Sequence, residues 1–223
     1  MLIQITINDT LTAISADQTI SLMELLMKGG WIMVFILILS LIAIYVFIER
    51  FLTVKKAAKD PAAFMEKLKS LVLQGDINGA KVLCAEMATP FARMIEKGLA
   101  RLGNPLQNIK ESIEDVGKIE IYKLEKNLPI LAAVSGTAPM VGFLGTVIGM
   151  IKAFMAIAQQ EGTVSPKLLS SGIYEALITT AFGLIVGIIA FLCYNYLVTR
   201  VQNVIHNMEY TATEFIDLIQ EPK

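Results

Sequence analysis

A single carboxylate, Glu175, lies near the start of an otherwise apolar run that continues to Val198. Moving an ionisable side chain into hydrocarbon costs roughly 2.5–3.5 kcal/mol on insertion scales, so such residues usually face a bundle interior or a water path. The alternative interpretation is that Glu175 lies at the outer interface and only complements the positive N-terminal end of its helix. On the first interpretation, the residue serves chemistry with ions or protons inside a bilayer.

Hydroxyl side chains lie at depths close to that of Glu175. Counted from the outer ends of their apolar segments at about 1.5 Å per residue, Thr146 lies roughly 18 Å deep and Thr180 roughly 12 Å deep. A hydroxyl both donates and accepts hydrogen bonds, so it can orient or relay a proton without bearing charge. Each threonine could instead bond back to a carbonyl of its own helix. A carboxylate and two hydroxyls at neighbouring depths can line one hydrated path.

Small residues and prolines are dense in the same two segments. Glycines four residues apart, such as Gly145 and Gly149, let two helix backbones approach closely in a membrane. A proline inside a helix frees a backbone carbonyl and bends the helix. We expect close helix packing at Gly142, Gly145, Gly149, Gly183 and Gly187, and helix kinks at Pro129 and Pro139.

Three segments are long and apolar enough to cross a membrane. The chain is 55% hydrophobic, which is too apolar for an ordinary soluble domain. About 20 apolar residues span the hydrocarbon core, and an isolated spanning segment must satisfy its backbone groups internally, which favours helices. The predicted transmembrane helices are residues 31–51, 128–158 and 172–198. The predicted fold class is therefore all-α, an integral protein of the lipid bilayer.

The basic residues predict the orientation of these spans. Residues 50–126 carry 14 of the chain's 19 lysines and arginines, whereas only Lys28 precedes the first span. We therefore expect the N-terminus outside and both the central domain, 52–127, and the C-terminus in the cytoplasm.

The segments between the spans have their own patterns. Residues 1–20 are predicted to be a mobile external segment, 21–30 an interfacial helix ended by two glycines, and 159–171 an external loop. Turn residues divide the central domain into helices that start near Pro61, run over about 77–87 and 91–102, and start again near Leu106. The apolar stripe of the helix that starts near Leu106 continues from Lys118 into Leu128 without a glycine or a proline. Residues 199–223 likewise continue the helical pattern of the third span. The second and third spans should therefore extend into a cytoplasmic helical bundle.

Several classes of function find no support in the sequence. The net charge of −1 does not favour nucleic-acid binding. Cys84 and Cys193 are expected on the cytoplasmic side and inside the third span, which favours neither a disulfide nor a metal site. His206 is the only histidine. With no nucleophile–base pair, metal cluster or phosphate loop, neither an enzyme nor a cofactor is predicted.

Two motifs in the spans resemble a known family. They read Thr137-Ala138-Pro139-x-Val141-Gly142-x-x-Gly145-Thr146-Val147 and Gly172-Ile173-x-Glu175-Ala176-Leu177-x-x-Thr180-Ala181-x-Gly183-Leu184. Weaker support comes from Leu73-x-Gly75-Asp76 and Gly98-Leu99-x-Arg101-Leu102-Gly103. The chain, after about Ser21, resembles the ExbB/TolQ/MotA family of stator subunits driven by the proton motive force. Its three-span layout is most similar to ExbB or TolQ.

The resemblance implies a homo-oligomeric ring, typically a pentamer, in the bacterial inner membrane, with a periplasmic N-terminus. Its second and third helices would line a pore that holds ExbD- or TolR-like single-span partners, each with a proton-binding aspartate. The family's pore positions carry over to Thr146, Glu175 and Thr180, with Thr179 as a possible additional pore residue. Lys152 departs from the family pattern, and we expect it to snorkel to the outer interface.

The resulting hypotheses belong to different classes. In the leading one, proton flow at the interface between ring and partner energises a TonB-like protein for outer-membrane import. A TolQ-like role with a TolA-like protein in envelope maintenance is the alternative within the family. A static scaffold would use Glu175 and the threonines only to hold helices together. A self-sufficient channel is disfavoured because only Glu175 titrates within the pore-facing segments.

Overall fold

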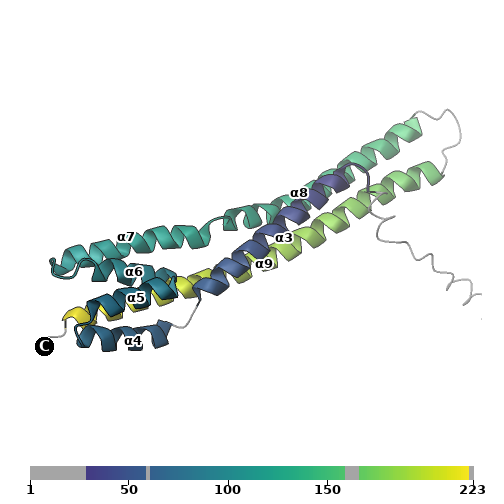
Figure 1. The fold of residues 1–223 in the computed structure, drawn as a ribbon. Helices are drawn as coiled ribbons and strands as arrows, with labels where there is room; N and C mark the ends of the chain where they lie inside the picture. The colour runs from purple at the N-terminus through teal and green to yellow at the C-terminus, as the bar shows by residue number, and fades with distance from the viewer. Residues whose placement is uncertain (1–28, 59–60, 159–165, 221–223) are drawn as a thin grey trace, which may run out of the picture. The chain divides into compact units, whose positions relative to one another are not determined.

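The computed structural model describes residues 29–58, 61–158 and 166–220. Helices and turns make up these residues, which confirms the all-α fold class for the part of the chain described. The helices are α3 Ile32–Ala57, α4 Pro61–Leu73, α5 Ile77–Met87, α6 Pro90–Leu99, α7 Leu106–Glu125, α8 Leu128–Ala158 and α9 Pro166–Gln220 (Figure 1). The predicted external segment 1–20, almost all of the interfacial helix 21–30 and half of the loop 159–171 lie outside the described residues.

Three helices, α3, α8 and α9, are long and apolar enough to cross a membrane. Helix α8 has the bounds of the second predicted span, and α3 extends beyond the first span to Ala57. Helix α9 begins at Pro166 rather than at Gly172. Proline is well suited to the first helical position, where its missing N–H would have had no partner. Helix α9 therefore includes residues 166–171, which the sequence analysis assigned to the loop 159–171.

The chain divides into two compact units. Unit 1 comprises the residues up to Leu37 together with Pro139–Leu184, and unit 2 comprises Ile38–Ala138 together with the chain from Ile185 onward. Unit 1 thus contains Glu175 and the threonines singled out above, and unit 2 contains the short helices. Each unit is described separately below.

In unit 2, helices α4 to α7 gather around the C-terminal part of α9 (Figure 1). Their shared core is closed by Leu68, Ile95, Ile113 and Phe215, which are all almost fully buried. A Cβ on Gly98 would lie 2.7 Å from the ring of Phe215 and 2.8 Å from Ile113. Any larger residue at position 98 would require these side chains or the helix to shift, so this close approach explains part of the supporting motif.

Local residues end and start the short helices as the sequence predicted. Asp76 caps α5 by accepting a hydrogen bond from the Gly79 N–H at 2.8 Å. Ala88, with φ of 48°, turns the chain after Met87, and Pro90 begins α6. Helix α5 has the predicted bounds and α7 the predicted start, whereas α6 ends at Leu99, earlier than predicted.

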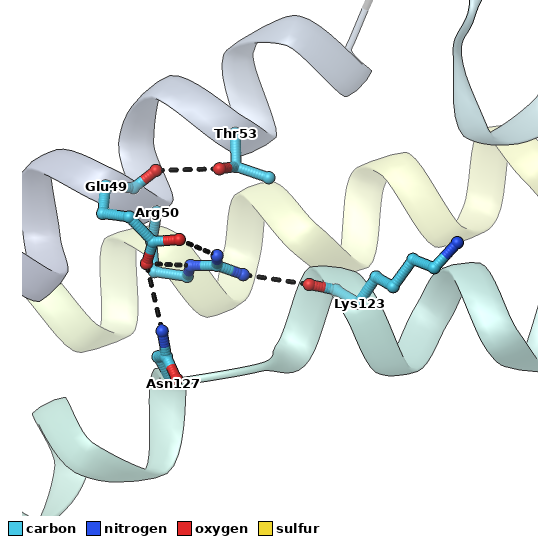
Figure 2. Close-up of polar contacts among 5 residues, drawn as sticks. All are labelled: Glu49, Arg50, Thr53, Lys123 and Asn127. Atoms are coloured by element: carbon cyan, nitrogen blue, oxygen red, sulfur yellow. Dashed lines mark hydrogen bonds and ion pairs between the residues drawn. The ribbon is translucent and has the colours of Figure 1, made fainter.

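The second span is separated from the preceding helix by a short turn, whereas the sequence predicted one continuous helix. Helix α7 ends at Glu125 and α8 begins at Leu128, because Asn127 takes a left-handed φ of 69°. This turn removes the usual helical donor for the Lys123 carbonyl, the N–H four residues on. Arg50 replaces that donor, with its Nη1 2.9 Å from the carbonyl oxygen (Figure 2).

Glu49 completes the junction between α3 and the α7–α8 turn. Its carboxylate accepts a hydrogen bond from Asn127 Nδ2 at 3.2 Å and pairs with the neighbouring Arg50, whose side chain is almost fully buried (Figure 2). The charged Arg50 donor thus satisfies the carbonyl that the turn leaves without its helical partner. Pro129, just after the turn, is the second residue of α8, so the bend expected there coincides with the helix start. Pro139 lies inside α8.

Candidate functional site

Helices α8 and α9 meet in unit 1 through glycine. A Cβ on Gly142 would lie 2.9 Å from the Thr179 carbonyl oxygen and 3.2 Å from the Gly183 Cα. A Cβ on Gly149 would lie 2.9 Å from the Gly172 carbonyl oxygen. Backbone therefore packs directly on backbone, the arrangement that small residues permit in a membrane. The predicted packing glycines Gly142, Gly145, Gly149, Gly183 and Gly187 are all buried.

Glu175 forms an ion pair with Lys152 across this helix contact. The Lys152 Nζ lies 2.6 Å from Oε1 of Glu175, and the two side chains are 48% and 20% exposed. From the sequence we expected Lys152 to snorkel to the outer interface, and we did not predict its ion pair with Glu175. The two residues lie at comparable distances from the ends of their spans, which indicates a similar depth but not which way either side chain points. A carboxylate in an apolar helix thus has a cationic partner from the neighbouring helix.

The turn before α3 also packs against Glu175. A Cβ on Gly30 would collide with Oε1 of Glu175, and Gly30 has a positive φ of 65°. Both the close approach and the left-handed backbone favour glycine at this position. The carboxylate is therefore enclosed by three segments of unit 1: the turn before α3, α8 through Lys152, and its own helix.

The threonines differ in what they bond. Thr180 Oγ1 donates to the Gly142 carbonyl of α8 at 2.9 Å, which links the two helices. Thr146 Oγ1 donates to the Phe143 carbonyl of its own helix at 2.6 Å. Thr179 is fully buried, contacts Gly145, and donates to the Ala176 carbonyl at 2.8 Å. Thr146 and Thr180 keep partial exposure, whereas Thr179 lies inside the α8–α9 contact.

The arrangement places one carboxylate close to hydroxyl side chains in unit 1. Glu175 is the only carboxylate among the described residues of that unit. Lys152 pairs with this carboxylate, and the threonine hydroxyls can accept or donate hydrogen bonds once their backbone bonds open.

Unit 2 contains a buried carboxylate, Glu120 of α7, at a position where the apolar side chains of that helix face the core. Glu120 is 3% exposed and pairs with Arg93 of α6 and, at 2.7 Å, with Lys123. Burial alone raises the pKa of Glu120, but the hydrogen bonds and charges of Arg93 and Lys123 outweigh it and hold the pKa below its usual value. Glu120 occupies a buried position among the apolar residues of α7, and a carboxylate at such a position indicates that a cation lies nearby.

Residues 86–210, more than half of the chain, match the MotA/TolQ/ExbB proton channel family. The matched region includes both motifs of the spans and the Glu120 cluster. Together with three helices long and apolar enough to cross a membrane, the match identifies a multi-pass membrane protein.

Individual relatives have two kinds of name. Over 139 residues the chain is 37% identical to the biopolymer transport protein ExbB of Aquifex aeolicus, a match covering 62% of this chain and 87% of that protein. Over 101 residues it is 38% identical to the Tol-Pal system protein TolQ of Haemophilus influenzae, covering 45% of this chain and 43% of that protein. The exbB1 protein of Vibrio cholerae is 31% identical over 111 residues, or 47% of this chain and 49% of that protein. The chain thus spans less than half the length of the latter two.

Proposed function

The chain belongs to the MotA/TolQ/ExbB proton channel family, and we propose that it is the ring-forming stator subunit of an energy-transducing motor in the bacterial inner membrane. The ring, typically a pentamer, surrounds single-span ExbD-like subunits. Proton flow between ring and partner then energises a TonB-like protein for outer-membrane import. The ExbB-like role is favoured because the ExbB match covers most of that relative.

The single observation that carries this proposal is the setting of Glu175. A carboxylate that only complements a helix end would need no cation within 2.6 Å and no glycine turn packed on it. In this proposal the proton-binding aspartate belongs to the single-span partner, as the resemblance to ExbB and TolQ implies. In this mechanism Glu175 orients or gates that aspartate at the wall of the pore.

Thr146 and Thr180 line the same path in this proposal. Their partial exposure supports the assignment. Each hydroxyl donates a hydrogen bond to a backbone carbonyl, and it could donate instead to water or to a side chain of the partner. Thr179 is the less favoured pore residue because its side chain is fully buried between the helices. Thr179 would only contribute to helix packing, unless α8 and α9 separate during proton transfer.

Orientation follows from the charges of the sequence. The excess of lysine and arginine over residues 50–126 supports a cytoplasmic unit 2 and C-terminus. Glu175 and Lys152 then lie toward the periplasmic side, where protons enter under the proton motive force.

A TolQ-like role is the second candidate, favoured by identities of 38% and 41% to two TolQ proteins. In that role the partners are TolR- and TolA-like and the output is envelope maintenance. Purifying the chain from its native membrane with its single-span partner distinguishes the two roles, because the partner's periplasmic part either binds a TonB-like or a TolA-like protein.

The test of the mechanism is uptake driven by the proton gradient, in cells with matched protein levels. We expect Glu175→Gln to assemble normally but to lose most uptake, and the double variant Thr146→Val, Thr180→Val to do the same. Glu209→Gln, an exposed carboxylate on the same helix α9, is the matched control and should retain uptake.

Two results would contradict this mechanism. Near-normal uptake by Glu175→Gln would show that the charge of Glu175 does not serve coupling. Retained uptake by the threonine double variant would favour a static scaffold, in which these hydroxyls only hold helices together.

A further inference from the structure

Unit 2 has a cavity of about 250 Å³ where α3, the start of α6 and α7 meet. Helix α3 contributes its last turns, the junction between α5 and α6 contributes the residues around Pro90, and α7 contributes its C-terminal turns. The residues that carry the argument are Thr53, Lys56, Pro90, Arg93, Glu120 and Lys123. The proton path proposed above involves none of them.

The charges around this cavity do not cancel. Lys56, Arg93 and Lys123 each bring a positive charge, and Glu120 brings the one negative charge. Glu120 is shared by Arg93 and Lys123, whereas no partner is found for Lys56 in the part of the chain described. The lining therefore has a net charge of about +2 at neutral pH, since lysine and arginine are protonated there.

Two buried polar groups beside the cavity are left without hydrogen-bond partners among the described residues. They are Nε of Arg93 and Oγ1 of Thr89. Thr89 precedes α6 but its hydroxyl does not cap that helix, and Pro90 follows with no N–H to offer. The N-terminal end of a helix carries a partial positive charge, which adds to the field of the three cations. An anion with several oxygens would satisfy donors of this kind.

The position along the chain places these cations at the depth of lipid headgroups. Lys56 follows the apolar part of α3, which ends at Phe51, by at most about 7.5 Å of helix. Lys123 precedes Leu128, where the apolar part of α8 begins, by a similar length. The headgroup and interfacial layer is roughly 5–8 Å thick on each side of the hydrocarbon core. Basic pockets at this depth on membrane proteins are suited to phosphate groups of lipids.

We propose that this cavity binds a phosphate-bearing anion, supplied by the headgroup of an anionic phospholipid of the adjoining leaflet. Lys56 and Lys123 contact the phosphate from two sides, and Arg93 adds its positive charge at the cavity wall while remaining paired with Glu120. The bound lipid ties the end of α3 to α6 and α7, next to the α7–α8 turn. This inference rests on the chain's spanning a membrane and is independent of proton coupling.

The experiment measures lipid binding to the purified, delipidated full chain in detergent, by native mass spectrometry. The probes are phosphatidylglycerol, phosphatidylcholine of the same acyl chains, and inorganic phosphate alone. The test variant is Lys56→Gln, Lys123→Gln, which keeps the Arg93–Glu120 pair intact. The control is Lys67→Gln, Lys69→Gln, which removes the same charge from exposed positions of α4 away from the cavity.

We expect the normal chain to bind phosphatidylglycerol in preference to phosphatidylcholine. The cavity variant should bind phosphatidylglycerol roughly tenfold or more weakly, since each basic residue near a membrane surface adds a severalfold gain in affinity for anionic lipid. The control variant should bind as the normal chain does. If the double variant fails to fold, Lys56→Gln alone, at an exposed position, should weaken binding about threefold to fivefold.

Equal binding of the two lipids, or a cavity variant that binds like the control, would overturn the proposal. Inorganic phosphate that displaces phosphatidylglycerol at low millimolar concentration would assign the cavity to a free phosphate and overturn the lipid as its source.

Discussion

Replacing Lys152 with methionine tests whether the pair with Glu175 is a working part of the site. Methionine keeps the length of the side chain and removes the charge. Exposed ion pairs contribute about 0.2–1 kcal/mol and breaking a buried pair costs about 3–5 kcal/mol. With Glu175 20% exposed and Lys152 48% exposed, the pair lies between these limits. We expect Lys152→Met to lower the free energy of unfolding by about 1–3 kcal/mol.

The two partners should not be equivalent. Lys152→Met leaves a carboxylate enclosed by Gly30 and two helices, whereas Glu175→Gln leaves an ammonium that is half exposed and can swing outward on its flexible stem. Glu175→Gln should therefore cost less than Lys152→Met. The double variant should be no less stable than Lys152→Met alone, because the uncompensated charge is then gone.

Thermal unfolding of the purified chain in detergent measures these differences. For a chain of this size about 1 kcal/mol corresponds to a shift of about 2–4 °C in the melting temperature, so Lys152→Met should lower it by about 2–12 °C. In the uptake assay Lys152→Met should impair coupling and Lys152→Arg should restore it, since the guanidinium keeps the charge beside Glu175. Strictly additive losses of stability in the double variant, together with full uptake by Lys152→Met, would refute the argument.

Two further predictions address packing and pH. Gly145→Leu should disrupt the α8–α9 contact, because even a Cβ at this position would collide with Thr179. Size-exclusion chromatography and native mass spectrometry should then show that the oligomer is lost. An intact, functional oligomer would contradict this prediction. Because the pKa of Glu120 is held below its usual value of 4.5, its ion pairs stabilise the fold above about pH 4.5 and lose this effect as the pH falls through the lower folded pKa. The advantage of the normal chain over Glu120→Gln in thermal unfolding should therefore shrink from neutral to acid pH, and an advantage that does not change with pH would be evidence against it.

The sequence by itself determined the helices, because their signals are local. Apolar length defines the spans, since about 20 residues must cross the hydrocarbon core. Proline and cap residues define the ends of the short helices, as Asp76 does for α5 and Pro90 for α6. Glycine spacing also indicated the face on which α8 packs, and Gly142, Gly145 and Gly149 are buried on it.

The break between α7 and α8 could not be predicted in this way. Residues 118–128 contain neither glycine nor proline, and their apolar stripe continues across the break. The left-handed Asn127 is stabilised by Arg50, which lies 73 residues before the carbonyl that it satisfies. A turn held by a partner so distant in the chain leaves no periodic signal at the turn itself.

The partners of the two buried carboxylates were likewise decided by tertiary structure. Glu175 meets Lys152 from 23 residues away, and Glu120 meets Arg93 from 27 residues away. Sequence gives the depth of a residue along its helix, but the rotation of that helix about its axis follows from packing against its neighbours. Rotation decides whether a cation at the right depth reaches a carboxylate or points to lipid. The partners from other helices, Lys152 and Arg93, were therefore not predictable, whereas Lys123 lies three residues after Glu120 on the same helix.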